Sequence, residues 1–165
     1  MKPIRGRVHL FGDNIDTDQI YPGRYIELTE PEDIKQHAME GVDPGFADSV
    51  QRGDIIVAGT NFGCGSSREH AVITLKSSGV SAVVAKSFAR IFYRNAINQG
   101  LTVVEVQSLD QMKLCAGDML TVNVEMGVVA SGSGEEWSFT PLPVNITEIL
   151  EAGGVFKFYN KPQKT

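Results

Sequence analysis

The sequence predicts an α/β protein in which a largely parallel central sheet is flanked by helices and extended by antiparallel strands. Apolar runs at 54–58, 82–85 and 101–106 alternate with helical patterns, which is the β-α-β-α-β order of a parallel sheet. Residues 119–125 alternate between apolar and polar positions, as antiparallel strands do. The 165 residues are enough for a single domain, 1–165, with its own hydrophobic core.

The N-terminal third predicts one strand and a long irregular region. Residues 1–11 predict a first strand rather than a signal peptide, because they lack the apolar segment and the cleavage site that a signal peptide requires. An acidic loop follows at 12–20 and contains Asp18 among three carboxylates. Prolines and glycines interrupt 21–52, which predicts a loop with one short helix over 31–39. Because loops of this length are usually functional or mobile, we expect 21–52 to be a mobile region that selects substrate.

The segment 61–70, NFGCGSSREH, carries most of the functional information. It follows the apolar run 54–58 and opens a helix predicted from about 67 to 77, so it is a strand-to-helix turn. Glycines allow a sharp turn, and the free N–H groups of a helix start attract anions. The hydroxyls of Ser66 and Ser67 and the guanidinium of Arg68 would then lie in the first helical turn, where they could donate to a bound anion. The alternative is that Ser66 and Glu69 form an ordinary capping box, which leaves no role for an anion.

The rest of the chain predicts three more elements. The helix at 88–98 has an apolar face and a basic face. Its apolar face contains Phe88, Ile91, Phe92 and Ile97, and its basic face contains Arg90 and Arg94. An antiparallel pair follows at 119–125 and 137–139. A tail helix at 145–150, with Asn145 as its cap, ends at two glycines.

Composition excludes several classes of function. The net charge of −5 argues against nucleic acid as a partner, because phosphate binding requires a basic surface. No apolar stretch is long enough to span a membrane. Cys64 and Cys115 are too few for a disulfide framework, which favours a reducing compartment, the cytoplasm. Two cysteines and three scattered histidines also predict no metal site in this chain.

Three segments of the chain form a recognisable set: GDNIDTDQI at 12–20, NFGCGSSREH at 61–70, and KSFARI at 86–91 followed by NQGL at 98–101. Together they resemble the swivelling domain of the aconitase superfamily. The resemblance is to the stand-alone form of that domain, the small subunit of 3-isopropylmalate dehydratase and of homoaconitase. It implies an aconitase-like β/β/α domain.

The resemblance also implies a reaction. A hydro-lyase of this family dehydrates and rehydrates a 2-hydroxy di- or tricarboxylic acid, so that the hydroxyl moves to the neighbouring carbon. In leucine biosynthesis this interconverts 2-isopropylmalate and 3-isopropylmalate. The family's large subunit carries a [4Fe-4S] cluster whose open iron is a Lewis acid. This chain is therefore expected to hold no cofactor, to be inactive alone, and to work in a heterodimer or heterotetramer.

Residue roles follow from the positions that match the family's motifs. Ser66 corresponds to the base that removes a proton from the carbon next to a carboxylate. Gly65, Ser67 and Arg68 correspond to substrate-binding groups, with the guanidinium holding a carboxylate. Asp18 corresponds to an aspartate that orients a histidine of the large subunit.

A second resemblance concerns substrate choice. In short, archaeal-type small subunits a loop beginning Tyr-Leu has an apolar third residue for isopropylmalate and an arginine for homoaconitate. The corresponding residues here are Tyr25, Ile26, Glu27 and Leu28. Glu27 would repel a third carboxylate, which argues against homoaconitase as the activity. It does not select the isopropyl group either, so dimethylmalate and citramalate stay open as alternative substrates. Arg24 lies beside the loop and is an alternative partner for a carboxylate.

Two other classes of function stay open on the sequence alone. One is a non-catalytic, anion-binding regulatory module that uses the same turn. The other is a hydrolase with Cys64 or Ser66 as nucleophile, for which His70 is the one nearby histidine.

Overall fold

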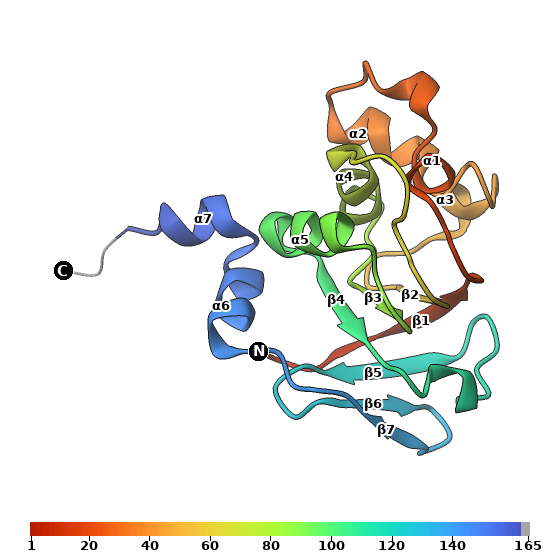
Figure 1. The fold of residues 1–165 in the computed structure, drawn as a ribbon, viewed down its shortest axis with the longest axis vertical. Coiled ribbons are helices and arrows are strands. Elements are labelled where there is room, and N and C mark those ends of the chain that lie inside the picture. Colours follow the sequence, from red (N-terminus) through yellow and green to blue (C-terminus); the bar gives the residue numbers. More distant parts are fainter. Residues whose placement is uncertain (163–165) are drawn as a thin grey trace.

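The structure, a computed structural model, describes residues 1–162 and is built on a seven-stranded mixed sheet with the order β4-β3-β2-β1-β5-β6-β7 (Figure 1). The strands are β1 (Ile4–Leu10), β2 (Ile55–Ala58), β3 (Ala82–Ala85), β4 (Thr102–Glu105), β5 (Met119–Asn123), β6 (Val128–Ser131) and β7 (Glu136–Ser138). Strands β1 to β4 are parallel, whereas β5 pairs antiparallel with β1 and continues into β6 and β7. The predicted α/β class is confirmed.

The parallel half is apolar on both faces because it is covered on both faces. All residues of β2 and β3 are buried, which explains their continuous rather than alternating apolar runs. Helices α4 (Glu69–Ser77) and α5 (Arg90–Gln99) lie on one face, where Ile56 and Val83 join a core with Leu75 and Phe92. The antiparallel strands curl over the other face (Figure 1). The order of layers is the predicted β/β/α.

The region 12–52 contains more regular structure than predicted. The acidic loop includes helix α1 (Thr17–Ile20), capped by a reciprocal Asp16–Gln19 box. The helix predicted over 31–39 is α2 (Pro31–Ile34) followed by the 3₁₀ turn η2 (Lys35–His37). Two further turns are η1 (Gly23–Tyr25) and α3 (Phe46–Ser49). The prediction that the remainder of 21–52 is loop was therefore wrong at these two short elements and holds for the rest.

Helix boundaries differ from the prediction at two functional places. Helix α4 begins at Glu69, two residues later than predicted, so Ser67 and Arg68 precede it. Helix α5 begins at Arg90, and Phe88 lies in the preceding loop. Ile91 does not belong to the apolar face, because 51% of its surface is exposed.

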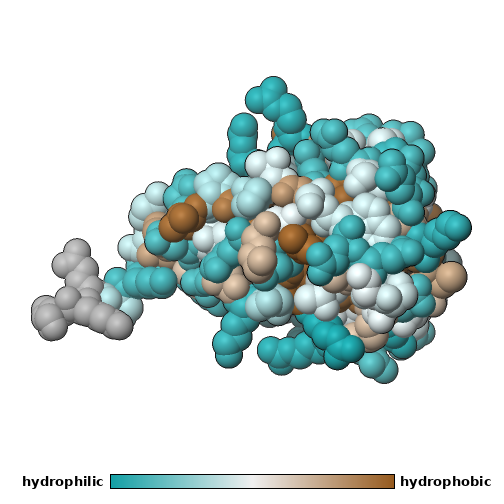
Figure 2. Space-filling model, turned by 90° about the horizontal axis from the view of Figure 1, so that it is seen from below, coloured by the Kyte–Doolittle hydropathy of each residue, from teal (hydrophilic) through white to brown (hydrophobic). Residues whose placement is uncertain are grey.

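The C-terminal part also has elements that the sequence pattern did not indicate. Strand β6 makes the antiparallel pair three-stranded, and a 3₁₀ turn, η3 (Leu109–Gln111), precedes β5. Helix α6 (Val144–Ala152) has Pro143 at its N-cap position and no side-chain cap, so Asn145 is not the cap, and the helix ends at Gly153 as predicted. Helix α7 (Val155–Tyr159) projects from the body and exposes Phe156, and hydrophobic atoms are visible along this arm (Figure 2).

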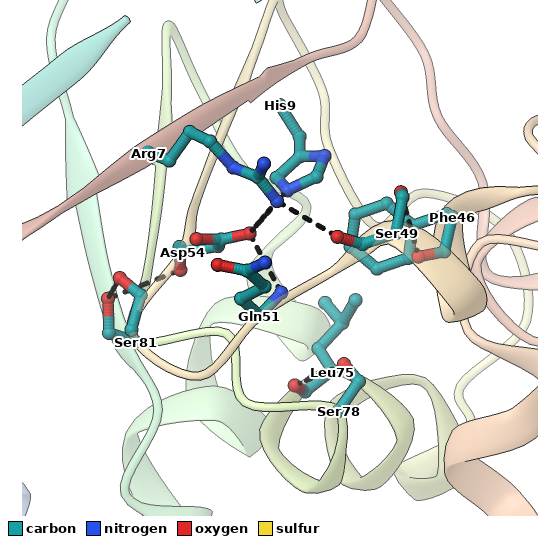
Figure 3. Close-up of polar contacts among 10 residues, drawn as sticks. Arg7, His9, Phe46, Ser49, Gln51, Asp54, Leu75, Ser78 and Ser81 are labelled. Atoms are coloured by element: carbon teal, nitrogen blue, oxygen red, sulfur yellow. Dashed lines mark hydrogen bonds and ion pairs between the residues drawn. The ribbon is translucent and has the colours of Figure 1, made fainter. Parts of the chain in front are cut away.

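A buried carboxylate fixes the amino edge of the parallel strands (Figure 3). Asp54, just before β2, has one carboxylate oxygen 2.7 Å from His9 Nε2 and 3.1 Å from an Arg7 guanidinium nitrogen, both on β1. The same oxygen accepts from the Gln51 N–H, and Arg7 also donates to the Ser49 carbonyl. This cluster joins β1, β2 and the end of α3. Among residues 1–162, no helix has the length and apolarity that a membrane span requires.

Candidate active site

Three loops meet at the carboxyl edge of the parallel strands, where ligands of such sheets bind. They follow β1, β2 and β3. Isolated bridges join Asp16 to Cys64 and Phe62 to Phe88, so the 61–70 turn lies between the acidic loop and the start of α5. Asn61 also donates from Nδ2 to Asn14 at 3.2 Å. The segments 12–20, 61–70 and 86–91, which carry most of the family resemblance, are therefore brought together.

Two glycines give the 61–70 turn its path. Gly63 and Gly65 have φ angles of +83° and +94°, a region that other residues adopt at a cost. Gly63 also has no room for a side chain, because a Cβ would lie 2.2 Å from Cγ of Phe92 on α5. Its N–H donates to the Ile15 carbonyl at 2.7 Å. The turn is thus packed directly between the acidic loop and α5.

The capping-box interpretation of Ser66 and Glu69 was wrong. The N-cap of α4 is Arg68, with no side-chain cap, so the two serines and the arginine are not in the first helical turn. Helix α1 holds the segment instead, since Thr17 donates through Oγ1 to the Ser66 carbonyl and through N–H to the Cys64 carbonyl, both at 2.8 Å. The Ser66 hydroxyl is therefore not used to cap α4.

The serines open onto a cleft of about 710 Å³, which we call the Ser66 cleft. It combines the glycine turn, the end of the acidic loop and the exposed side of α5. The lining residues include Gly65, Ser66, Ser67, Arg68, Thr17, Asn61, Ile91, Arg90, Arg94 and Asn95. Four predicted site residues, 65–68, thus share one surface. The contribution of α5 was not predicted, although its start beside the carboxyl end of β3 was a usable signal.

Arg68 and Asp18 are already paired. The guanidinium Nη1 donates to Asp18 Oδ1 at 3.0 Å and to the Tyr21 carbonyl at 3.1 Å. The Gly23 N–H, followed by the Arg68 guanidinium, holds the pKa of Asp18 below its usual value. A Cβ at Gly23 would lie 3.0 Å from the other Nη of Arg68, so this glycine leaves room for the pair.

The predicted specificity loop lies beside Arg68 but does not line the Ser66 cleft. Its first two residues are tied to Glu40, whose Oε1 accepts from Arg24 at 2.8 Å and from the Tyr25 hydroxyl at 3.0 Å. The Tyr25 ring stacks on His37, which contacts the other Glu40 oxygen at 2.6 Å. Burial would raise the pKa of Glu40, but these hydrogen bonds lower it overall. Further along the loop, Ile26 and Glu27 are exposed and Leu28 is half-buried.

His70 does not form a dyad with a nucleophile. Its Nε2 lies 3.0 Å from the Leu28 carbonyl, and its ring stacks on Tyr21 at 5.2 Å. These contacts hold the end of the loop against α4. They leave the hydrolase hypothesis for Cys64 or Ser66 without a base.

The residues that the structure describes do not fit a metal cluster. Within 1–162 no group of three histidine, cysteine or acidic side chains is placed to hold a metal ion. Cys64 and Cys115 are unpaired thiols, and a four-iron cluster requires three or four thiolates.

The mixed sheet and the cleft at its carboxyl edge define an aconitase-like domain, and comparisons with known proteins agree with this class. The model of the aconitase C-terminal domain matches residues 14–109, so the chain belongs to that family. Its relatives extend over the full length. A 3-isopropylmalate dehydratase small subunit of Nautilia profundicola is 49% identical over 159 residues, which are 96% of this chain and 95% of the relative. An isopropylmalate/citramalate isomerase small subunit of Methanocaldococcus jannaschii is 52% identical, over 96% and 94% of the two chains.

A solved structure gives the same result. The crystal structure of the 3-isopropylmalate dehydratase LeuD from Methanocaldococcus jannaschii matches with a TM-score of 0.88 and 44% identity, over 96% of this chain and 93% of that one. The aconitase-like fold is therefore confirmed.

Proposed function

We propose that this chain is the small subunit of a hydro-lyase that interconverts 2-isopropylmalate and 3-isopropylmalate in leucine biosynthesis. The observation that carries this proposal is the similarity of 49% to the Nautilia profundicola subunit over 96% of this chain, in which the predicted site residues 65–68 line one cleft. Activity requires a large subunit. The iron–sulfur cluster belongs to that partner and would supply Lewis acidity toward the leaving hydroxyl. We also infer a cytoplasmic location, because both cysteines are free thiols.

In this proposal Ser66 is the base. As an alkoxide it takes the proton from the carbon next to a carboxylate, the electron pair of that C–H bond forms the double bond, and hydroxide leaves the adjacent carbon. Rehydration in the opposite sense completes the isomerisation. A serine hydroxyl is a weak base, so its alkoxide requires a positive environment. Arg68 and the unpredicted Arg90 and Arg94 line the same cleft and favour it.

The remaining roles stay as predicted. Ser67, Arg68 and the Gly65 turn bind one carboxylate, and Asp18 orients a histidine of the partner. The loop from Arg24 to Leu28 selects the substrate side chain, and its mobility is part of the proposal. A related alkylmalate such as citramalate is the second candidate substrate, favoured by the 52% identity to the isopropylmalate/citramalate isomerase small subunit of Methanocaldococcus jannaschii.

The test is reconstitution with the large subunit encoded in the same genome. The mixture should convert 2-isopropylmalate through an unsaturated acid, detected by its ultraviolet absorbance, while each subunit alone should not. Ser66→Ala should remove turnover at unchanged subunit affinity, with Ser78→Ala, outside the cleft, as the matched control. A wild-type complex inactive on isopropylmalate, citramalate and dimethylmalate would favour the regulatory-module alternative instead.

Substrate choice has its own test. Glu27→Arg should raise kcat/KM for homoaconitate relative to isopropylmalate, because the exposed acid would be replaced by a cation. An unchanged ratio would remove this loop from the specificity proposal.

A further inference from the structure

The Ser66 cleft is positive in a protein that is negative overall. Three arginines line it, Arg68, Arg90 and Arg94, and no aspartate or glutamate does. The whole chain has a net charge of −5. This local excess of positive charge suits a ligand with more than one negative charge.

The three arginines are not equally available. Arg68 is occupied by Asp18 and the Tyr21 carbonyl. Arg90 and Arg94 are exposed, and within residues 1–162 their guanidinium groups form no ion pair and no hydrogen bond. The cleft therefore has one cation that is held in place and two that are free.

The position of the free pair is unfavourable for the helix itself. Arg90 is the first residue of α5, where the helix dipole is positive, and no acid lies in the first turn to offset it. Arg94 follows four residues later on the same side, and like charges at this spacing repel. Local rules are usually broken in this way at functional sites. A bound anion would remove both conflicts.

We propose that Arg90 and Arg94 bind the second carboxylate of a dicarboxylate whose first carboxylate is held by Ser67 and Arg68. Residues four apart on a helix face stand about 5–6 Å apart at Cβ, close enough for two guanidinium groups to share one carboxylate. Ile91, half exposed in the same cleft, offers an apolar contact to an alkyl group between the carboxylates. This inference rests on the proposed function and names the substrate class of its site as a 2-hydroxy dianion.

A binding experiment on the full chain alone tests this without turnover. The probes are 3-isopropylmalate and 2-hydroxy-4-methylpentanoate, which is the same molecule without the second carboxylate. By NMR titration, we expect the chain to bind the dianion at least about tenfold more tightly, because the second carboxylate adds charged hydrogen bonds to two guanidinium groups. The double variant Arg90→Gln, Arg94→Gln should bind both probes equally weakly.

A matched control has the same change of charge elsewhere. Arg5 and Arg52 are exposed and lie outside the cleft, so Arg5→Gln, Arg52→Gln should keep the preference for the dianion. If the control loses the preference as well, the effect is one of net charge and the proposal is wrong. Equal preference in the wild type and the Arg90, Arg94 variant would also overturn it.

The assembled enzyme separates substrate binding from subunit docking. At saturating large subunit, the Arg90, Arg94 variant should raise KM for isopropylmalate at least about tenfold, with the subunit dissociation constant unchanged. The opposite result, weaker assembly with an unchanged KM, would mean that these arginines face the partner and would overturn the proposal. If the wild-type complex has no activity while the isolated chain still prefers the dianion, the proposed function fails and this binding site stands.

Discussion

Arg68 and Asp18 are fifty residues apart in the chain and form an ion pair at 3.0 Å at the rim of the Ser66 cleft. The sequence assigns them different tasks, a carboxylate clamp and a group that reaches a histidine of the partner. In the chain alone they neutralise each other. Assembly with substrate and partner would therefore exchange one set of charged hydrogen bonds for another, at little net electrostatic cost.

Asp18→Asn should separate assembly from folding. We expect kcat of the assembled enzyme to fall about 10- to 100-fold, as is typical when an orienting carboxylate is removed. The melting temperature of the isolated chain should hardly change, because 68% of the Asp18 side chain is exposed, an asparagine oxygen can still accept from the Gly23 N–H, and the Tyr21 carbonyl still accepts from Arg68. Asp110→Asn, which removes a similarly exposed aspartate (65%) from a pair with Lys86, is the control and should retain kcat. A stable, fully active Asp18→Asn enzyme would remove the orienting role.

The core of the fold could be predicted because its signal is local and repeated. Four-residue apolar runs identify β2 and β3 whatever surrounds them. The start of α4 could not be predicted in the same way. Ser66 and Glu69 match a capping box by spacing, but Thr17, forty-nine residues away, holds the segment by hydrogen bonds to its carbonyls. The long-range contact with Thr17, and not the local spacing of Ser66 and Glu69, determines the conformation of this segment.

The site was predictable only in part for a similar reason. The motif located Ser66, Ser67 and Arg68, and the structure places them in one cleft. Arg90 and Arg94 were recognised as a basic helix face, and that face could not be assigned to the cleft without the packing of Phe92 against Gly63. The tie between Glu40 and the specificity loop joins residues with no shared pattern.

Gly63 and Gly65 should differ sharply when changed to alanine. Gly63→Ala combines a positive φ with a Cβ 2.2 Å from Phe92, so it should lower the free energy of unfolding by about 3 kcal/mol or more. Gly65→Ala should cost only about 1–2 kcal/mol, because its Cβ would lie 3.4 Å from the Thr17 hydroxyl and the strain is in φ alone. Urea unfolding of the isolated chain measures both. Equal losses would mean that the contact with α5 does not constrain the turn.

Glu40 should control the specificity loop without touching the cleft. Glu40→Gln removes the charge that holds Arg24, Tyr25 and His37, so the loop should lose its fixed position. We expect the ratio of kcat/KM for isopropylmalate and citramalate to change about tenfold, which corresponds to ~1.4 kcal/mol, close to the lower end of the contribution of a charged hydrogen bond. Glu32→Gln, whose side chain is 82% exposed in a pair with Lys35, is the matched control. An unchanged substrate ratio with both variants would contradict this role.

Asp54 should make stability depend on acid pH. Burial alone would raise its pKa, but contacts from His9, the Gln51 N–H and Arg7 hold the pKa below the ordinary value of 3.8. Because the folded pKa is lower than the unfolded one, the ionised carboxylate stabilises the fold fully above about pH 5, and this contribution is lost as the pH falls through 3.8 and below. Asp54→Asn should therefore lower the free energy of unfolding at pH 7 by about 2–3 kcal/mol.

The same variant should differ less from the wild type at pH 3, because the wild-type carboxylate is then losing its charge. Urea unfolding at both pH values measures this convergence. Asp48→Asn, at an exposed position in the neighbouring α3, should show a small and pH-independent difference. Since Asp54 lies at the amino edge of the sheet and the Ser66 cleft at the carboxyl edge, KM of the assembled enzyme should stay unchanged. A gap between the Asp54 variant and the wild type that stays constant from pH 7 to pH 3 would show that packing, and not charge, accounts for the contribution of this residue.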